Sequence, residues 1–173
     1  RDSRAKQSRI YRNKFTLPVV TPDSLIWINQ TTEGTASALT LTPTETEFGN
    51  VGFDMSQATK DFGFAAKYAW TLVIGSDQRW DITSTSETGG DFQARDATNT
   101  LDTNDNALEM NVGVGRTLLW NGVISGTGSI TKIGDGTLAL GNGNNSFTGG
   151  FTVNNGLVTL NGGGRVIRGN IVV

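Results

Sequence analysis

The chain contains no cysteine and no histidine among its 173 residues, and it has only three prolines. Without cysteine, neither a disulfide nor a Cys-ligated metal can hold the fold together, so stability must come from packing and main-chain hydrogen bonds. Without histidine, the chain lacks the commonest general base and metal ligand. The composition therefore argues against an enzyme, and we expect no cofactor.

Long apolar runs are also missing. No stretch approaches the roughly 20 apolar residues of a membrane-spanning helix, and no segment has the apolar core of a secretory signal. We therefore expect no direct insertion into a membrane. The chain begins at Arg1 and ends on Ile171, Val172 and Val173, which favours a processed product or a piece of a longer chain over an intact gene product.

Basic residues are concentrated at the start of the chain. The first 14 positions hold six of the 14 basic residues and one of the 16 acidic residues, so they carry a net charge of +5 and the rest of the chain carries −7. Residues 1–14 lack apolar periodicity, which predicts an exposed, extended arm that lies against the acidic body or a neighbouring chain. Because the acidic body would repel phosphate, we expect no nucleic-acid partner.

Residues 115–173 repeat with a period of about 20 residues, and corners of Gly and Asn separate the apolar positions. One such unit cannot bury its own apolar face and must stack on a copy of itself, so the repeat predicts a parallel β-solenoid. The columns expected at this period are Trp120, Leu140 and Leu160; Ile133, Val153 and Val173; and Thr131, Phe151 and Ile171.

Residues 15–114 contain short β-type runs with irregular spacing, rich in Thr, Val, Ile, Phe and Trp. The best helix candidate, residues 55–67, is interrupted by Gly63 and has no sustained apolar stripe. We therefore predict an all-β chain in which residues 15–173 form a single β-helix domain, irregular over 15–114 and regular over 115–173. The polar segments 84–91 and 94–106 are predicted surface loops. The expected strands are 15–20, 25–29, 38–42, 48–53, 62–74, 79–84 and 107–114.

The segment from Gly126 to Leu157 contains the sequences GTGSITKIGDGTLAL and GNNSFTGGFTVNNGL. It closely resembles the autotransporter-associated β-strand repeat of bacterial passenger domains, and residues 118–126 look like the strand that precedes this repeat. The resemblance implies a right-handed parallel β-helix exported to the bacterial cell surface, where it would act as a stalk, fibre or adhesin scaffold. It implies no catalytic residues.

Acidic residues supply the candidate chemistry. Clustered acids with a nearby base occur in β-helical polysaccharide lyases and hydrolases, but a carboxylate pair needs opposed placement that sequence proximity does not supply. A solvated acidic loop is the favoured interpretation. Residues 102–106 have the ligand spacing that begins a calcium loop, yet the turn glycine and the closing acid are absent, which leaves open only a weak surface Ca²⁺ site. The candidate group comprises the acids Asp91, Asp96, Asp102 and Asp105, together with the basic residue Arg95.

The four tryptophans could serve as carbohydrate platforms where they face solvent. Trp120 heads an apolar column and Trp70 opens an apolar run, so both are expected in the core. Trp80 lies between Arg79 and Asp81 and is the one we expect to be exposed. Loops 84–106 and Trp80 therefore define a second hypothesis, an adhesin passenger fragment that binds extracellular glycans or host matrix.

The first hypothesis is a non-enzymatic extracellular structural protein, a subunit or segment of a bacterial surface fibre or stalk. The open ends of a solenoid carry unpaired main-chain groups, so copies of the chain or adjoining β-helix coils could stack end to end. A polysaccharide-cleaving enzyme is the third hypothesis. The predicted self-assembly residues are Arg1, Arg4, Lys6, Arg9, Arg12, Lys14, Phe15 and Leu17 at one end and Ile171, Val172 and Val173 at the other.

Overall fold

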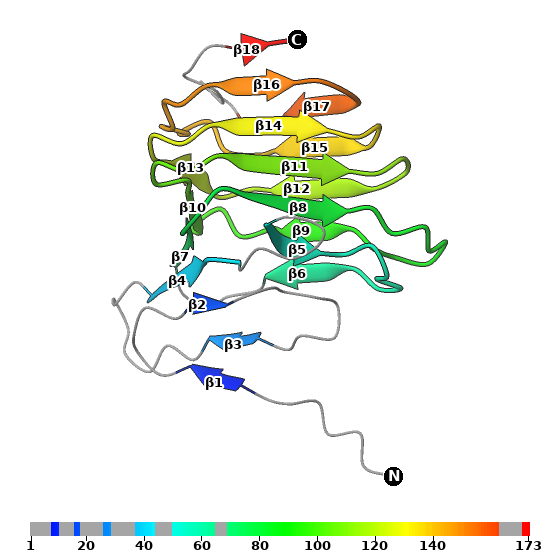
Figure 1. Ribbon diagram of the computed structural model, residues 1–173, viewed down its shortest axis with the longest axis horizontal. Helices are drawn as coiled ribbons and strands as arrows, with labels where there is room; N and C mark the ends of the chain where they lie inside the picture. Colours follow the sequence, from blue (N-terminus) through cyan, green and yellow to red (C-terminus); the bar gives the residue numbers. More distant parts are fainter. Residues whose placement is uncertain are drawn as a thin grey trace.

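The computed structural model describes residues 8–10, 16–17, 26–28, 37–43, 50–64, 69–162 and 171–173. In this part of the chain every regular element is a β-strand, and no helix occurs. The strands stack in parallel, one above another, in three sheets (Figure 1). The prediction of an all-β chain built from stacked parallel strands is confirmed.

The sheets are numbered by the order in which the chain enters them. Sheet 1 contains β2 (Thr16–Leu17), β4 (Ser37–Leu41), β7 (Trp70–Ile74), β10 (Thr100–Asp102) and β13 (Val123–Ser125). Sheet 2 contains β5 (Val51–Asp54), β8 (Gln78–Ile82), β11 (Leu108–Val112), β14 (Ile130–Ile133), β16 (Phe151–Val153) and β18 (Ile171–Val172). Sheet 3 contains β6 (Phe62–Phe64), β9 (Phe92–Ala94), β12 (Thr117–Trp120), β15 (Thr137–Leu140) and β17 (Leu157–Leu160).

From β4 to β15 the chain visits sheets 1, 2 and 3 in a fixed rotation, and we call one such passage a rung. Two further strands, β1 (Ser8–Ile10) and β3 (Ile26–Ile28), pair with each other outside these sheets. The strand β1 lies within the segment predicted as the basic arm. Strand β10 lies within the predicted loop 94–106, and β9 lies at the boundary between the two predicted loops, where no strand was expected. The rotation of the chain is therefore more regular than its sequence indicates.

Inward side chains of successive rungs stack on one another. In sheet 1 the main-chain register aligns Leu39, Leu72, Leu101 and Ile124, and all four are buried. Strands β7, β8 and β11 each alternate buried and half-buried residues, as expected when one face of a pleated strand meets the core.

The rungs shorten along the chain. In sheet 3 the register offset is 30 residues from Phe62 to Phe92, 26 from Phe92 to Leu118, and 20 from Leu118 to Leu138 and from there to Val158. The predicted 20-residue repeat is therefore confirmed in this sheet, together with the column of Trp120, Leu140 and Leu160. Shorter corners account for the change, because nine residues separate β8 from β9 but only three separate β14 from β15.

In sheet 2 the predicted columns are wrong by one residue at their first step. The structure pairs Ile130 with Phe151, and Lys132 with Val153, an offset of 21 residues. The offset becomes 20 only from Phe151 to Ile171. Thr131 and Ile133 therefore do not share columns with Phe151 and Val153. The physical reason is burial, because both Ile130 and Phe151 face the core and a register set by Thr131 would turn Phe151 outward.

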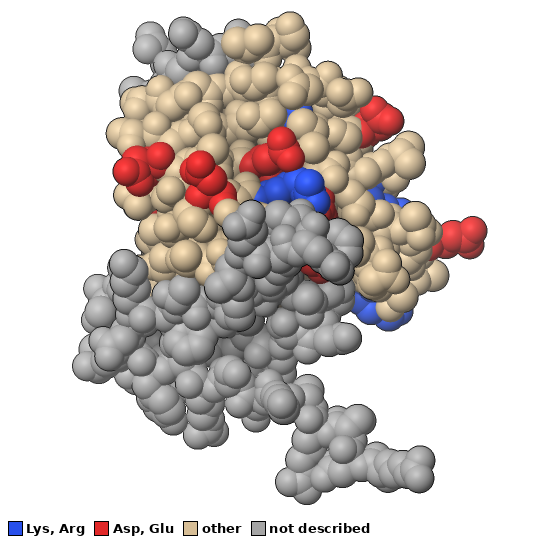
Figure 2. Space-filling model, in the orientation of Figure 1, with Lys and Arg blue, Asp and Glu red and all other residues tan. Residues whose placement is uncertain are grey.

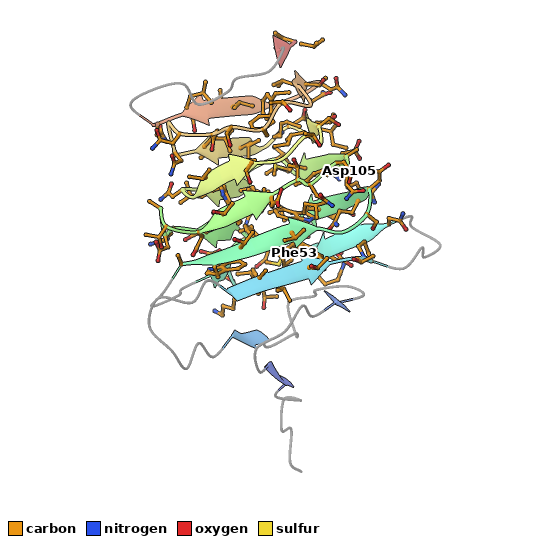
Figure 3. The ribbon with its side chains drawn as sticks, turned by 90° about the vertical axis from the view of Figure 1, so that its left-hand side faces the viewer. Phe53 and Asp105 are labelled. Carbon is orange, nitrogen blue, oxygen red and sulfur yellow. The ribbon has the colours of Figure 1, made fainter. Side chains whose placement is uncertain are left out.

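An aromatic cluster joins the three sheets inside the stack. The ring centroid of Phe53, in sheet 2, lies 4.8 Å from that of Trp80 in the same sheet and 5.1 Å from that of Phe92 in sheet 3. Both pairs meet edge-on. The ring centroid of Trp120, in sheet 3, lies 6.5 Å from that of Trp80 in sheet 2 and 6.5 Å from that of Trp70 in sheet 1. Figure 3 labels Phe53 within this interior and Asp105 on an exposed loop at its margin. Such pairs add to the free energy gained by burying the rings.

The expectation that Trp80 is exposed is wrong, because its side chain is fully buried. Consecutive residues of a strand point to opposite faces. Charged residues on both sides of a tryptophan in a strand therefore place it on the inward face. Arg79 and Asp81 lie on the outer face and form an ion pair of 2.9 Å.

Glycines at the corners should differ in how much their replacement costs. A Cβ atom added at Gly128 would lie 1.9 Å from the carbonyl oxygen of Asn106, whereas one added at Gly115, where φ is +72°, would meet nothing within 4 Å. We expect Gly128→Ala to lower the free energy of unfolding by about 2 kcal/mol through overpacking. Gly115→Ala should cost about 1 kcal/mol through its left-handed backbone alone. Urea unfolding of both variants tests this, and a larger loss at Gly115 would contradict it.

Candidate functional site

The predicted self-assembly residues lie at opposite ends of the stack where the structure describes them (Figure 1). At one end Arg9 pairs with Trp27 in the β1–β3 sheet, and Leu17 pairs with Leu41. At the other end Ile171 of β18 pairs with Phe151. The remaining members lie outside the described residues: Arg1, Arg4, Lys6, Arg12, Lys14 and Phe15.

The end formed by β17 and β18 exposes apolar side chains. Leu157 is 55% exposed, Leu160 49% and Val172 57%. One rung earlier, Leu140 occupies the same column as Leu160 and is 1% exposed. Among the described strands, β17 and β18 are also the edges of sheets 3 and 2. This end, called the apolar end below, therefore combines apolar surface with unpaired strand edges.

Among the described residues, few charges lie near the apolar end. Between residues 126 and 162 the only charged residues are Lys132 and Asp135. In Figure 2 the charged side chains gather around the middle of the visible face, and the part above them is mostly uncharged. Another molecule could approach the apolar end without removing many charged groups from water.

The predicted surface loop 94–106 is wrong as a single excursion. Strand β10 lies within it, and Asn99, Leu101 and Thr103 are fully buried. Its exposed parts are the turn near Ala97 and the turn at Asn104 and Asp105. The carbonyl oxygen of Ala97 accepts a 3.5 Å hydrogen bond from Nδ2 of Asn142. The apolar Leu101 between polar neighbours is the signal that could have identified this short strand.

Carboxylates of one rung accept hydrogen bonds from main-chain amides of the next. Asp61 Oδ1 accepts from the amides of Gly90 and Asp91, each at 3.1 Å. Asp91 Oδ1 accepts from the amide of Thr117 at 2.9 Å, and Asp77 Oδ1 from that of Ala107 at 2.8 Å. These acids satisfy amide groups at corners where the strand ladder is interrupted.

Two other acids of the predicted group, Asp96 and Asp102, bind their own turns. Asp96 accepts from the Thr98 amide at 2.9 Å and hydroxyl at 2.7 Å, and these bonds lower the pKa of Asp96. Asp102 accepts from the Asn104 amide at 2.8 Å. In the described part of the chain no three acidic side chains group as a metal site would require. The acids are thus engaged in local hydrogen bonds rather than collected on one face.

An asparagine replaces a strand in the last part of sheet 1. Asn145 is 1% exposed, its Oδ1 accepts from the amide of Ile124 at 2.7 Å, and its Nδ2 donates to the carbonyl of Asn142 at 3.0 Å. The amide of Ser146 donates to the carbonyl of Ile124 at 2.8 Å. This segment therefore continues the hydrogen-bonding pattern of the sheet without forming a strand.

Lys132 is a buried charged residue that the sequence analysis did not single out. The structure buries Lys132 completely and leaves Ile133 half-buried. Its Nζ atom donates to the carbonyl oxygens of Ile133 at 2.8 Å, Gly134 at 2.6 Å and Asn155 at 3.1 Å. The buried ammonium group therefore has three main-chain acceptors.

Comparison with known proteins gave no match, whether with family models, curated proteins or solved structures. The residues described here include no helix suited by length and apolar character to cross a membrane.

Lys132 should give the fold a distinctive dependence on pH. Burial lowers the pKa of Lys132 below its ordinary value of 10.5, and the charge of Asp135 opposes the shift in part. Between the lowered pKa and 10.5 the unfolded chain binds more protons, so the stability of the folded chain rises with pH. We expect unfolding experiments to show this rise in the wild type relative to Lys132→Met. A fall in that difference as the pH rises toward 10.5 would contradict the assignment.

Proposed function

We propose that this chain is a non-enzymatic structural protein of the bacterial cell surface, a segment of a secreted fibre or stalk whose units stack end to end. Its three sheets would close into a right-handed parallel β-helix, and its partners would be copies of itself or adjoining coils of the same kind. The protein would span a distance and bear mechanical load rather than catalyse a reaction.

The observation that carries this proposal is the apolar end. A strand edge with exposed main-chain groups and apolar side chains is a ready template for another strand. Leu157, Leu160 and Val172 offer both features together, and the columns beneath them already accept one rung upon another. A further rung from another molecule would continue the same pairing.

Two further observations support the proposal. The resemblance of the segment 126–157 to the autotransporter-associated repeat points to exported scaffolds. The acids that would serve a polysaccharide-cleaving site instead bind main-chain amides, as Asp91 and Asp102 do. Glycan binding through Trp80 loses its platform because that ring is buried, so the structural role is the function that the geometry favours.

Lysine at the apolar end should prevent stacking. In Leu160→Lys, a second rung would have to bury an unpaired ammonium group, because Leu160 shares its inward-facing column with the buried Leu140. We expect this variant to weaken self-association at least about tenfold, measured by sedimentation velocity and light scattering over a range of protein concentrations.

The chain offers a matched control for this experiment. Leu157 lies on the same strand as Leu160 but shares its outward-facing column with Thr137, which stays half-buried beneath a rung, so Leu157→Lys adds the same charge where a second rung would leave it in contact with water. This control should associate as the wild type does, with circular dichroism checking that all three proteins are folded. A wild-type chain that stays monomeric at every concentration would refute the proposal.

A further inference from the structure

Lys132 occupies a position that suits an apolar residue. Its column in sheet 2 holds Trp80 and Met110 in the preceding rungs and Val153 in the following one. Trp80 and Met110 are fully buried, as Lys132 is. Placing an ammonium group in such a column costs desolvation free energy unless its N–H groups find acceptors.

The acceptors come from two stacked corners. Residues 134–136 connect β14 to β15, and residues 154–156 connect β16 to β17 directly above. Each of these corners has three residues, whereas the preceding corner between β11 and β12 has four. Lys132 therefore lies at the rung where the corners reach their shortest length, and its ammonium group contacts both corners.

Glycine brings the carbonyl groups close to the ammonium group. Gly134 and Gly156 have φ of +75° and +79°. A Cβ atom added at Gly156 would lie 2.5 Å from the carbonyl oxygens of Gly134 and Gly136 and 2.9 Å from Nζ of Lys132. The corner thus has no room for a side chain, and its carbonyl oxygens surround the ammonium group.

The number of donors matches the number of acceptors. A primary ammonium group has three N–H donors and no acceptor, and the three carbonyl oxygens lie 2.6–3.1 Å from Nζ. A guanidinium group is planar and larger, so it does not fit this arrangement. The acceptors belong to the end of β14 (Ile133), the first corner (Gly134) and the second corner (Asn155), so the ammonium group forms a bridge between rungs.

We propose that the two corners form a binding site for a primary ammonium group, occupied in this protein by Lys132, and that this occupancy holds the corners together. The site is independent of the apolar end and of the proposed assembly. It ties β14 to the rung above through a charge-assisted contact, in addition to the strand ladder.

Chemical rescue tests the site directly. Lys132→Ala removes the atoms of n-propylammonium, so this cation should restore stability, raising the urea midpoint with saturation. Tetramethylammonium has the charge without N–H donors, and propan-1-ol has the chain without the charge, and neither should match it. If the alanine variant is unfolded without an additive, we expect n-propylammonium to restore folding and the other two compounds not to restore it. An equal response to all three additives, or to none, overturns the proposal.

A second variant keeps the interior filled. Lys132→Met places at this position the residue that Met110 provides one rung earlier, while Lys60→Met removes an exposed lysine as a control. We expect Lys132→Met to lower the folding equilibrium constant about tenfold or more, because buried carbonyl groups lose their donor, and Lys60→Met to leave it nearly unchanged.

Hydrogen exchange locates the effect. The amides of Asn154 and Leu157 donate to the carbonyls of Lys132 and Gly136 across the two corners, whereas the amide of Val123 donates to Asn99 at a distant corner. In Lys132→Met, exchange should quicken at Asn154 and Leu157 and stay unchanged at Val123. Wild-type stability together with unchanged exchange at Asn154 and Leu157 overturns the proposal.

Discussion

The main-chain ladder between successive rungs determines where every other group in the stack lies. Parallel pairing fixes which residue of one rung lies above which residue of the next, so each inward side chain must fit its counterpart. The column of Leu39, Leu72, Leu101 and Ile124 satisfies this demand with similar aliphatic residues. Where the columns hold larger residues, Phe53, Trp80 and Phe92 meet edge-on or stacked and connect sheets 2 and 3.

Polar groups at the corners also hold successive rungs in register. The ladder is interrupted at each corner, and there the chain supplies a side chain in its place. The carboxylates of Asp61 and Asp91 accept from amides of the following rung, and the side chain of Asn145 takes over a bond that a strand would make. As the corners shorten to three residues, glycine carbonyls and the ammonium group of Lys132 take this role. These charged groups therefore contribute to the stacking of successive rungs.

The regular part of the fold could be predicted because its side chains repeat. The column of Trp120, Leu140 and Leu160 follows from spacing alone, and so does the parallel stacking. The earlier rungs could not be read as well, because corners of changing length remove the period and short strands such as β9 and β10 resemble loops. Trp80 was expected to be exposed because charged residues flank it, whereas the alternation of side chains along a strand places it on the inward face. The first step of the sheet 2 columns was predicted one residue out of register, because the 20-residue period was applied to a step of 21 residues.

The carboxylates at the corners also give the stack a direction. Asp61, Asp77 and Asp91 lie on the earlier rung in each case, and the amides that they accept from belong to the later one. A completed rung therefore presents a template of fixed acceptors to the segment that follows it in the chain. Order can therefore propagate from the N-terminal rungs upward, because each rung that has formed offers hydrogen-bond acceptors to the next.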